Sequence, residues 1–276
     1  MPSIYAHFLP QLVTPEALAG GTVVVIDVLR ATTTITYALA SGAKLIVPCG
    51  EIDAARRIAV RLKGDSPGAA PLLGGERGGV PIDGFDIGNS PCEFTPARVA
   101  GRTIVFTTTN GTRAMLHCRQ AARVLLGSFV SLQAVVERLR GADRVHLLCA
   151  GTEGEVTRED VLVAGAITHG LMLPKQPGAS DAQTQYMLND EARIACDAWQ
   201  ATLPPAELPQ DNAPPPWLVQ ALADSKGGRN LQRVGLARDL ADCAALDRFA
   251  VVPELDVARG EIRAAQTGTI TGAWEG

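Results

Sequence analysis

Short apolar runs recur along the chain, and segments with helical spacing lie between most of them. The runs are rich in β-branched residues and cover residues 22–28, 44–48, 102–106, 123–126, 144–149 and 249–252. The helical segments, many of them rich in alanine, cover residues 33–41, 52–63, 111–119, 132–140, 159–170 and 190–199. Continuous apolar strands that alternate with helices are typical of a sheet buried on both faces. The pattern therefore predicts an α/β fold with a mainly parallel sheet.

The chain has 276 residues, 46% of them hydrophobic, which is enough for one large core. Residues 203–216, LPPAELPQDNAPPP, are expected to form a proline-rich surface loop. The helical segments on either side continue to cover one sheet, so we expect a single domain over residues 1–276. A strand, a threonine-rich loop and a helix occur twice, at 23–40 and 104–118, and an internal duplication is one interpretation of this repeat.

Charge and composition exclude several classes of protein. The formal net charge is -4, so a nucleic-acid footprint is not expected. The N-terminus, MPSIYAHFLPQL, has neither the basic nor the long apolar part of a signal peptide, and no run reaches the roughly 18 apolar residues of a membrane span. Six cysteines without a C-x-x-C pair fit reduced, packed thiols. We expect a cytoplasmic protein without a membrane partner.

Polar residues follow two of the predicted strands at their carboxyl ends, where ligands of open α/β sheets bind. VVVI continues as DVLRATTT (27–34), and IVF continues as TTTNGTRA (107–114). Gly111 permits close approach of a ligand, and a helix start with threonine hydroxyls favours an anion. Arg30 and Arg113 offer charge-assisted hydrogen bonds. A plain strand, turn and threonine N-cap explains TTTNGT equally well.

Asp27 ends an apolar run, and burying its carboxylate is expensive unless it is paired or binds a metal. An aspartyl phosphatase would carry a second aspartate two positions on, where this chain has Leu29. We therefore interpret Asp27 as a metal ligand, with a structural pair to Arg30 as the alternative.

Two further polar segments supply carboxylates. GGERGGVPIDGFDIGNSP (74–91) reads as a long ligand-rich loop, and CAGTEGEVTRED (149–160) follows another apolar run. Their oxygen ligands favour a hard cation such as Mg2+. A solvated acidic helix start is an equal alternative for Glu159 and Asp160.

One cysteine motif is set aside. Residues 92–98 have the C-x5-R spacing of cysteine-dependent phosphatases, but they lack the glycines, and Pro96 removes a backbone donor. The four histidines show no zinc-binding spacing.

Together these segments resemble the 2-phosphosulfolactate phosphatase (ComB) family. The resemblance rests on residues 26–34, 74–79, 84–91, 107–114 and 149–160, with a weaker match at 239–253. It implies a three-layer α/β/α fold with a mainly parallel or mixed sheet. It also implies a cytoplasmic, Mg2+-dependent phosphomonoesterase that removes phosphate from 2-phospho-3-sulfolactate, a step toward coenzyme M.

The individual roles are our own hypotheses. Catalytic residues are predicted to be Asp27, Arg30 and Asn110. Metal ligands are predicted among Asp27, Glu76, Asp86, Glu155 and Asp160. Substrate contacts are predicted from Arg30, Thr32, Thr33, Arg77, Asn89, Ser90, Thr108, Thr109, Asn110, Gly111, Thr112 and Arg113.

Two alternative functions fit the same residues. One is a phosphatase of another small phosphorylated acid, and the other is a non-catalytic anion-binding protein on the same fold. In each case the expected partner is a small anionic phosphorylated molecule, and a homodimer is compatible with the sequence.

Overall fold

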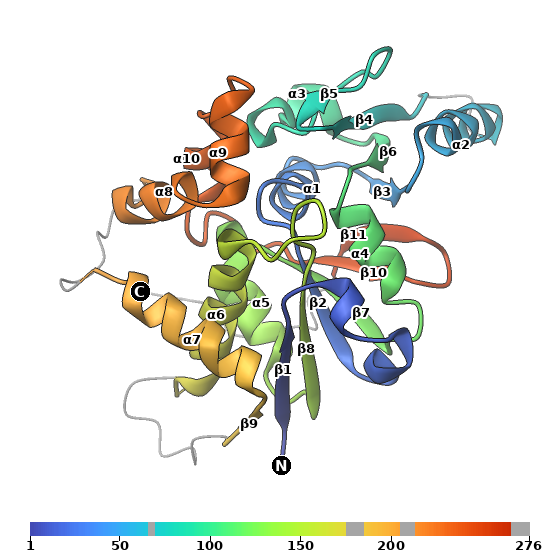
Figure 1. The fold of residues 1–276 in the computed structure, drawn as a ribbon. Coiled ribbons are helices and arrows are strands. Elements are labelled where there is room, and N and C mark those ends of the chain that lie inside the picture. Colours follow the sequence, from blue (N-terminus) through green and yellow to red (C-terminus); the bar gives the residue numbers. More distant parts are fainter. Residues whose placement is uncertain (66–69, 175–184, 205–212, 266–276) are drawn as a thin grey trace, which may run out of the picture.

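The computed structural model describes residues 1–65, 70–174, 185–204 and 213–265, which form one mixed sheet covered by helices (Figure 1). The strands are β1 Ser3–His7, β2 Thr22–Ile26, β3 Leu45–Pro48, β4 Leu72–Arg77, β5 Val80–Pro81, β6 Thr103–Thr107, β7 Arg123–Gly127, β8 Arg144–Cys149, β9 Met187–Leu188, β10 Pro253–Asp256 and β11 Glu261–Ala264. The α-helices are α1 Ala31–Ala40, α2 Ile52–Asp65, α3 Pro96–Val99, α4 Gly111–His117, α5 Leu132–Leu139, α6 Arg158–Met172, α7 Asp190–Thr202, α8 Pro216–Ala223, α9 Lys226–Arg233 and α10 Asp239–Cys243. Short 3-10 helices are η1 Pro10–Leu12, η2 Pro15–Leu18, η3 Pro91–Glu93 and η4 Phe129–Ser131. The predicted α/β/α fold is confirmed.

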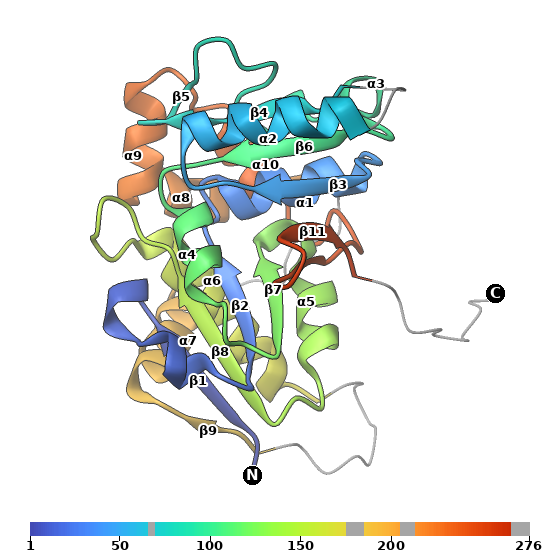
Figure 2. The same ribbon diagram turned by 90° about the vertical axis from the view of Figure 1, so that its right-hand side faces the viewer.

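Apart from the edge strand β5, which is antiparallel to β4, the sheet consists of two parallel blocks joined by an antiparallel hairpin. Its order is β5-β4-β6-β3-β11-β10-β7-β2-β8-β1-β9. Strands β4, β6 and β3 are parallel to one another, as are β7, β2, β8, β1 and β9, while β10 and β11 lie between the blocks as an antiparallel pair. Figure 2 shows that β2 runs across the direction of β3 and β6, so that the carboxyl ends of the two blocks converge.

Strand β2 shows why the apolar runs are continuous. Val24 and Ile26 pack into the core formed with α5, α6 and α7, whereas Val23 and Val25 pack into the core formed with α1 and α4. Alternate residues of one strand thus serve opposite faces. In the other block, Val105 of β6 packs under α2.

Two sequence-based element predictions were wrong. The run at 249–252 is not a strand, because Phe249 packs edge-on against Tyr37 and its N–H donates to the carbonyl of Val130 at 2.9 Å. Pairing begins at β10 instead, where Glu254 lies opposite Leu125.

The segment at 74–91 is also not wholly a loop. Its first four residues belong to β4, and Gly75 lies so close to β6 that a Cβ there would be 1.9 Å from the carbonyl oxygen of Thr107. Glycines hid this strand from the sequence pattern because they permit close backbone approach but carry no apolar side chain.

Residues 205–212 of the proline-rich segment lie outside the described residues. Among the described helices, none is long and apolar enough to cross a membrane. The single domain and the internal duplication stay predictions.

Candidate active site

A pocket lies where the carboxyl ends of β2, β4 and β6 converge and α9 packs beside them. It encloses about 660 Å³ of space between atoms, part of it open to solvent. The predicted site residues that line it are Asp27, Arg30, Glu76, Asn89, Thr109 and Asn110. The structure therefore brings together six of the seventeen predicted site residues, from three separate segments of the chain.

Asp27 follows β2 directly and is buried, with 8% of its surface exposed. Its Oδ1 accepts a hydrogen bond from the N–H of Ala31 at 3.2 Å, which caps the first turn of α1. Burial raises the pKa of Asp27 to about 7, and the carboxylates of Glu76 and Glu159 add to the rise, although the N–H groups of Ala31 and Gly111 oppose it. The ionised carboxylate is therefore poorly compensated by the protein alone.

Glu76, at the end of β4, is buried and tied to two loops. Its Oε1 accepts hydrogen bonds from the N–H of Thr109 at 2.8 Å and from the Thr109 hydroxyl at 3.0 Å. Its Oε2 accepts one from the N–H of Gly79 at 2.7 Å. The side chain thus fixes the loop after β6 against the loop after β4, and it holds a negative charge in the pocket.

Glu159 and Asp160 begin α6 and are both buried, so the interpretation as a solvated helix start was wrong. Asp160 accepts hydrogen bonds from the N–H of Val28 at 2.9 Å and of Gly151 at 3.0 Å. Burial, followed by the charges of Glu159 and Asp27, raises the pKa of Asp160 well above its usual value. Asp160 therefore joins the loop after β2 to the loop after β8, and it does not line the pocket.

Arg30 is buried and forms an ion pair with Asp239, not with Asp27. Its guanidinium donates to Asp239 Oδ2 at 2.6 Å, to Ser90 Oγ at 3.2 Å and to the carbonyl of Gly79 at 2.7 Å. Ser90 in turn donates to the same Asp239 oxygen at 2.7 Å. The alternative in which Asp27 serves only as the ion-pair partner of Arg30 is therefore excluded. Ser90 helps to position Arg30, because it accepts a hydrogen bond from the guanidinium and donates one to Asp239.

Most of the nominated threonines are engaged in local bonds. The hydroxyl of Thr33 donates to the carbonyl of Val28, and that of Thr32 accepts from the N–H of Asp27. Thr108 Oγ1 accepts from the N–H of Thr112, whose own hydroxyl donates back to the Thr108 carbonyl. These four threonines are buried and shape the loops without lining the pocket.

Three other predicted substrate contacts lie outside the pocket. Arg77 donates to the carbonyl of Gly50 and to Thr107 Oγ1, and Arg113 is exposed on α4. Gly111 packs against Asp27, since a Cβ there would be 2.7 Å from Asp27 Oδ2. None of the three lines the pocket, so the structure gives Arg77 and Arg113 no support as substrate contacts.

Two nominated metal ligands lie apart from the others. Asp86 is exposed and accepts from the N–H of Leu73 at 2.8 Å, where it stabilises the edge of the sheet. Glu155 is exposed and forms an ion pair with Lys226 at 3.0 Å. The sequence pattern could not separate them from Asp27 and Glu76, because acidic residues in glycine-rich loops look alike before the loops are placed.

Comparison with known proteins decides the family. The family model described as 2-phosphosulpholactate phosphatase matches residues 7–257. The chain belongs to this family. A relative from Symbiobacterium thermophilum, named "Probable 2-phosphosulfolactate phosphatase", is 40% identical over 86% of this chain and 92% of its own length. A relative of the same name from Synechococcus sp. (strain CC9605) is 36% identical over 95% of this chain and 98% of its own.

In this member of the 2-phosphosulfolactate phosphatase family, one wall of the pocket comes from a segment that the sequence analysis missed. Gly227, Asn230 and Arg233 of α9 line the pocket, and Arg233 donates to Asn230 Oδ1 at 3.0 Å. The run SKGGRN at 225–230 could have indicated this segment in the sequence, because it places a possible capping serine before two glycines and polar side chains. Ser225 caps the helix by accepting from the N–H of Gly228, and a Cβ on Gly227 would be 2.1 Å from Glu159 Oε1.

The donor atoms of the pocket fit a hard divalent cation. Asp27 and Glu76 both line it, and Glu159 Oε2 is buried without a hydrogen-bond partner in the described part of the chain. No three of the five nominated ligands, however, have oxygen atoms within 4.8 Å of one another among the described residues. Mg2+ commonly binds one or two carboxylates together with substrate phosphate and water, so a Mg2+ site does not require three carboxylates close together.

Proposed function

We propose that this protein is a Mg2+-dependent phosphomonoesterase that hydrolyses 2-phospho-3-sulfolactate to 3-sulfolactate and phosphate. Membership of the family supports the reaction, and the relatives carry it in their names. The observation that carries the proposal is that Asp27 and Arg30, three residues apart, line the same pocket. A carboxylate for a cation and a guanidinium for an anion are the groups that phosphoryl transfer needs side by side.

Arg30 is suited to bind an anionic group of the substrate. Three of its five N–H donors are used by Asp239, Ser90 and Gly79, which fix the plane of the guanidinium. The other donors remain for a ligand in the pocket. A guanidinium held in advance loses little freedom on binding, and it can fork onto two oxygens of a phosphate or sulfonate.

The substrate carries a second strong anion, the sulfonate, at a different carbon. Asn230 and Arg233, three residues apart and therefore on one face of α9, offer an amide and a guanidinium at the same pocket. We assign the sulfonate to this wall and the phosphate to the wall of Asp27 and Arg30. Two walls with separate donors would discriminate the disubstituted acid from a simple phosphate ester.

Asp27 and Glu76 would hold Mg2+ beside the phosphate. When bound, the ion would neutralise the phosphate oxygens and lower the pKa of the attacking water. Asp27 is fixed for this role by the N–H of Ala31, and Glu76 by Thr109 and Gly79. Attack of water on phosphorus would break the bond to the carbon-bound oxygen; one proton of the water would then end on that oxygen, as the hydroxyl of 3-sulfolactate, and the remaining hydroxyl would stay on the released phosphate.

Phosphate release from a panel of small phosphorylated acids, with and without Mg2+, tests the proposal. The panel contains 2-phospho-3-sulfolactate and phospholactate, which lacks the sulfonate. We expect the sulfonated substrate to have a kcat/KM at least about tenfold higher, because one charged hydrogen bond contributes about 1.5–3 kcal/mol. The Asp27→Asn variant, purified in parallel, reports any contaminating phosphatase.

Each outcome of the panel separates the candidate functions. Preference for another phosphorylated acid would replace the substrate but keep the enzyme. Binding of these acids without turnover of any of them would favour the non-catalytic anion-binding protein. Full turnover in excess chelator would contradict the Mg2+ assignment.

A further inference from the structure

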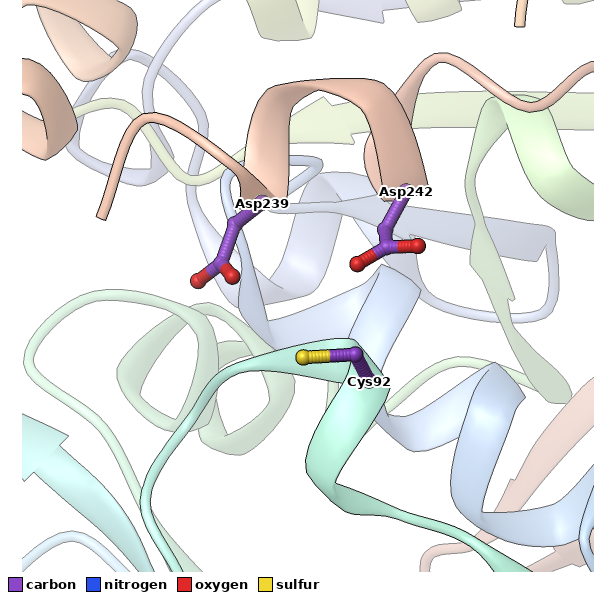
Figure 3. A group of neighbouring side chains, drawn as sticks. All are labelled: Cys92, Asp239 and Asp242. Carbon is purple, nitrogen blue, oxygen red and sulfur yellow. The ribbon is translucent and has the colours of Figure 1, made fainter.

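A second group of potential metal ligands lies behind the pocket, between α10 and η3. Cys92 of η3 and Asp239 and Asp242 of α10 each offer a ligand atom, and these atoms lie within 4.8 Å of one another. Figure 3 shows both aspartates extending from α10 toward the thiol of Cys92. The aspartates are three residues apart, so they share one face of the helix. No step of the proposed reaction uses this group.

Asp239 supplies independent evidence that the group is built for a cation. Its side chain is fully buried, and Oδ2 already receives Arg30 and Ser90. Its other oxygen, Oδ1, is buried without a hydrogen-bond partner in the described part of the chain. Arg238 Nε lies 3.8 Å from this oxygen, which is beyond hydrogen-bonding distance, and that side chain is 66% exposed. A buried carboxylate oxygen left unpaired is costly, and a bound cation would remove that cost.

The ligand types indicate which cation would bind. A thiolate with two carboxylates suits a borderline metal such as Zn2+ and is unsuited to Mg2+, which prefers oxygen ligands alone. Cys92 is exposed, so solvent can supply a further ligand from the open side. Burial and the neighbouring aspartates raise the pKa of the Cys92 thiol, which Arg238 opposes, so the thiol must release its proton to water when the metal binds.

We propose that Cys92, Asp239 and Asp242 form a site for Zn2+ or a similar thiolate-binding divalent cation, distinct from the pocket of Asp27 and Glu76. The two sites communicate through one carboxylate. Asp239 would bind the metal through Oδ1, while its Oδ2 holds Arg30 at the pocket wall. Metal binding at these three residues requires no particular substrate in the pocket.

Cobalt titration of the full-length protein tests the site, because a Co2+–thiolate bond has its own charge-transfer absorption. Among the described cysteines only Cys92 is exposed, so the band can be assigned to it. We expect one equivalent of Co2+ to develop the band and one of Zn2+ to remove it. Excess Mg2+ should leave the band unchanged, which separates this site from the pocket.

Variants at the ligands decide the assignment. Cys92→Ser should abolish the band, and Asp242→Asn should weaken Co2+ binding at least about tenfold, since even outer groups of metal sites contribute that much. Glu93→Gln is the matched control, because Glu93 is the next residue and lies outside the group. Melting curves establish that each variant is folded. A band that persists in Cys92→Ser, equal affinity in Asp242→Asn, or no saturable binding to the wild type would overturn the proposal.

Discussion

The loops that follow β2 and β6 share one hydrogen-bonding plan. In the first, Asp27 Oδ1 accepts from the N–H of Ala31, four residues on, and in the second, Thr108 Oγ1 accepts from the N–H of Thr112, also four residues on. Each side chain thereby caps the first turn of the following helix, α1 or α4. Only one of the two side chains is charged, and only that one lines the pocket.

The difference between the two loops indicates that the negative charge of Asp27 is not needed to cap the helix. Thr108 proves that a neutral hydroxyl can make the capping bond at the equivalent place, so the cap does not require a carboxylate. The carboxylate is instead a cost, because burial raises its pKa to about 7. Because a neutral residue would cap the helix without that cost, we propose that the carboxylate of Asp27 serves function rather than folding.

Asp27→Asn should therefore have the largest effect on activity and a small or favourable effect on stability. The variant keeps the oxygen that caps α1 but loses the charge that would hold Mg2+. We expect kcat to fall at least about a hundredfold, the usual scale for loss of a group that stabilises charge in the transition state. Steady-state phosphate release and calorimetric Mg2+ titration measure the two consequences.

Stability as a function of pH provides the control for this variant. The pKa of Asp27 is raised from 3.8 to about 7, so the folded state binds the proton more tightly than the unfolded state. Its contribution to the free energy of unfolding is therefore lost as pH rises across that window. Asp27→Asn cannot lose it, so its melting temperature without metal should match or exceed that of the wild type above pH 7. Lower stability with unchanged Mg2+ affinity would make Asp27 a structural cap after all.

The contact between the two loops can be broken at Gly111. A Cβ there would lie 2.7 Å from both Asp27 Oδ2 and the Cβ of Ala31. Gly111→Ala should force the loops apart, reduce kcat by about tenfold and cost about 1–3 kcal/mol of stability, as overpacking does. Phosphate release and chemical unfolding measure both effects.

Gly50→Ala is the matched control for that change. Its new Cβ would meet Leu116 Cδ1 at 3.6 Å, an ordinary contact, so stability should stay within about 0.5 kcal/mol. Wild-type activity in Gly111→Ala would show that catalysis does not require contact between the two loops. Asp27 and Thr108 would then cap their helices independently of each other.

The sequence predicted the fold and the place of the site because both follow from local patterns. Continuous apolar runs predicted the strands, and polar residues at the end of a run, as at Asp27 and Thr107, mark a carboxyl end. Glu76 was found differently, as a carboxylate in a glycine-rich segment that the sequence pattern did not identify as part of a strand. These local patterns can be recognised in the sequence without knowing which loops lie next to one another in the fold.

What the sequence could not predict depends on the long-range crossing of the two blocks. Asp239 is 209 residues from Arg30, yet it forms the ion pair that defines where that guanidinium lies. Cys92 was judged by its neighbours in the chain and dismissed, whereas its relevant neighbours belong to α10. Asp86, a predicted metal ligand, is exposed, and Glu159, for which a solvated helix start was an alternative, is buried, because only the tertiary structure decides which acidic residue is buried.

The smallest effects are expected from the two arginines, and they sharpen the comparison further. Arg30 is the residue before α1 and lines the pocket, whereas Arg113 is the third residue of α4 and is exposed. The same substitution, arginine to lysine, keeps the charge at both positions and removes the planar fork. Arg30→Lys should raise KM about tenfold, the scale of one charged hydrogen bond, and Arg113→Lys should change it less than about twofold.

Lysine is chosen at position 30 because alanine would leave Asp239 as an unpaired buried charge and would confuse binding with folding. KM from phosphate release, with melting curves beside it, separates the two contributions. If the variants raise KM equally, Arg113 reaches the substrate during turnover, and the loop after β6 recognises the anion as directly as the loop after β2. If only Arg30→Lys raises KM, the arginine before the helix contacts the substrate and the arginine inside the helix does not. The position of the arginine relative to the start of the helix then decides whether such a segment binds the substrate.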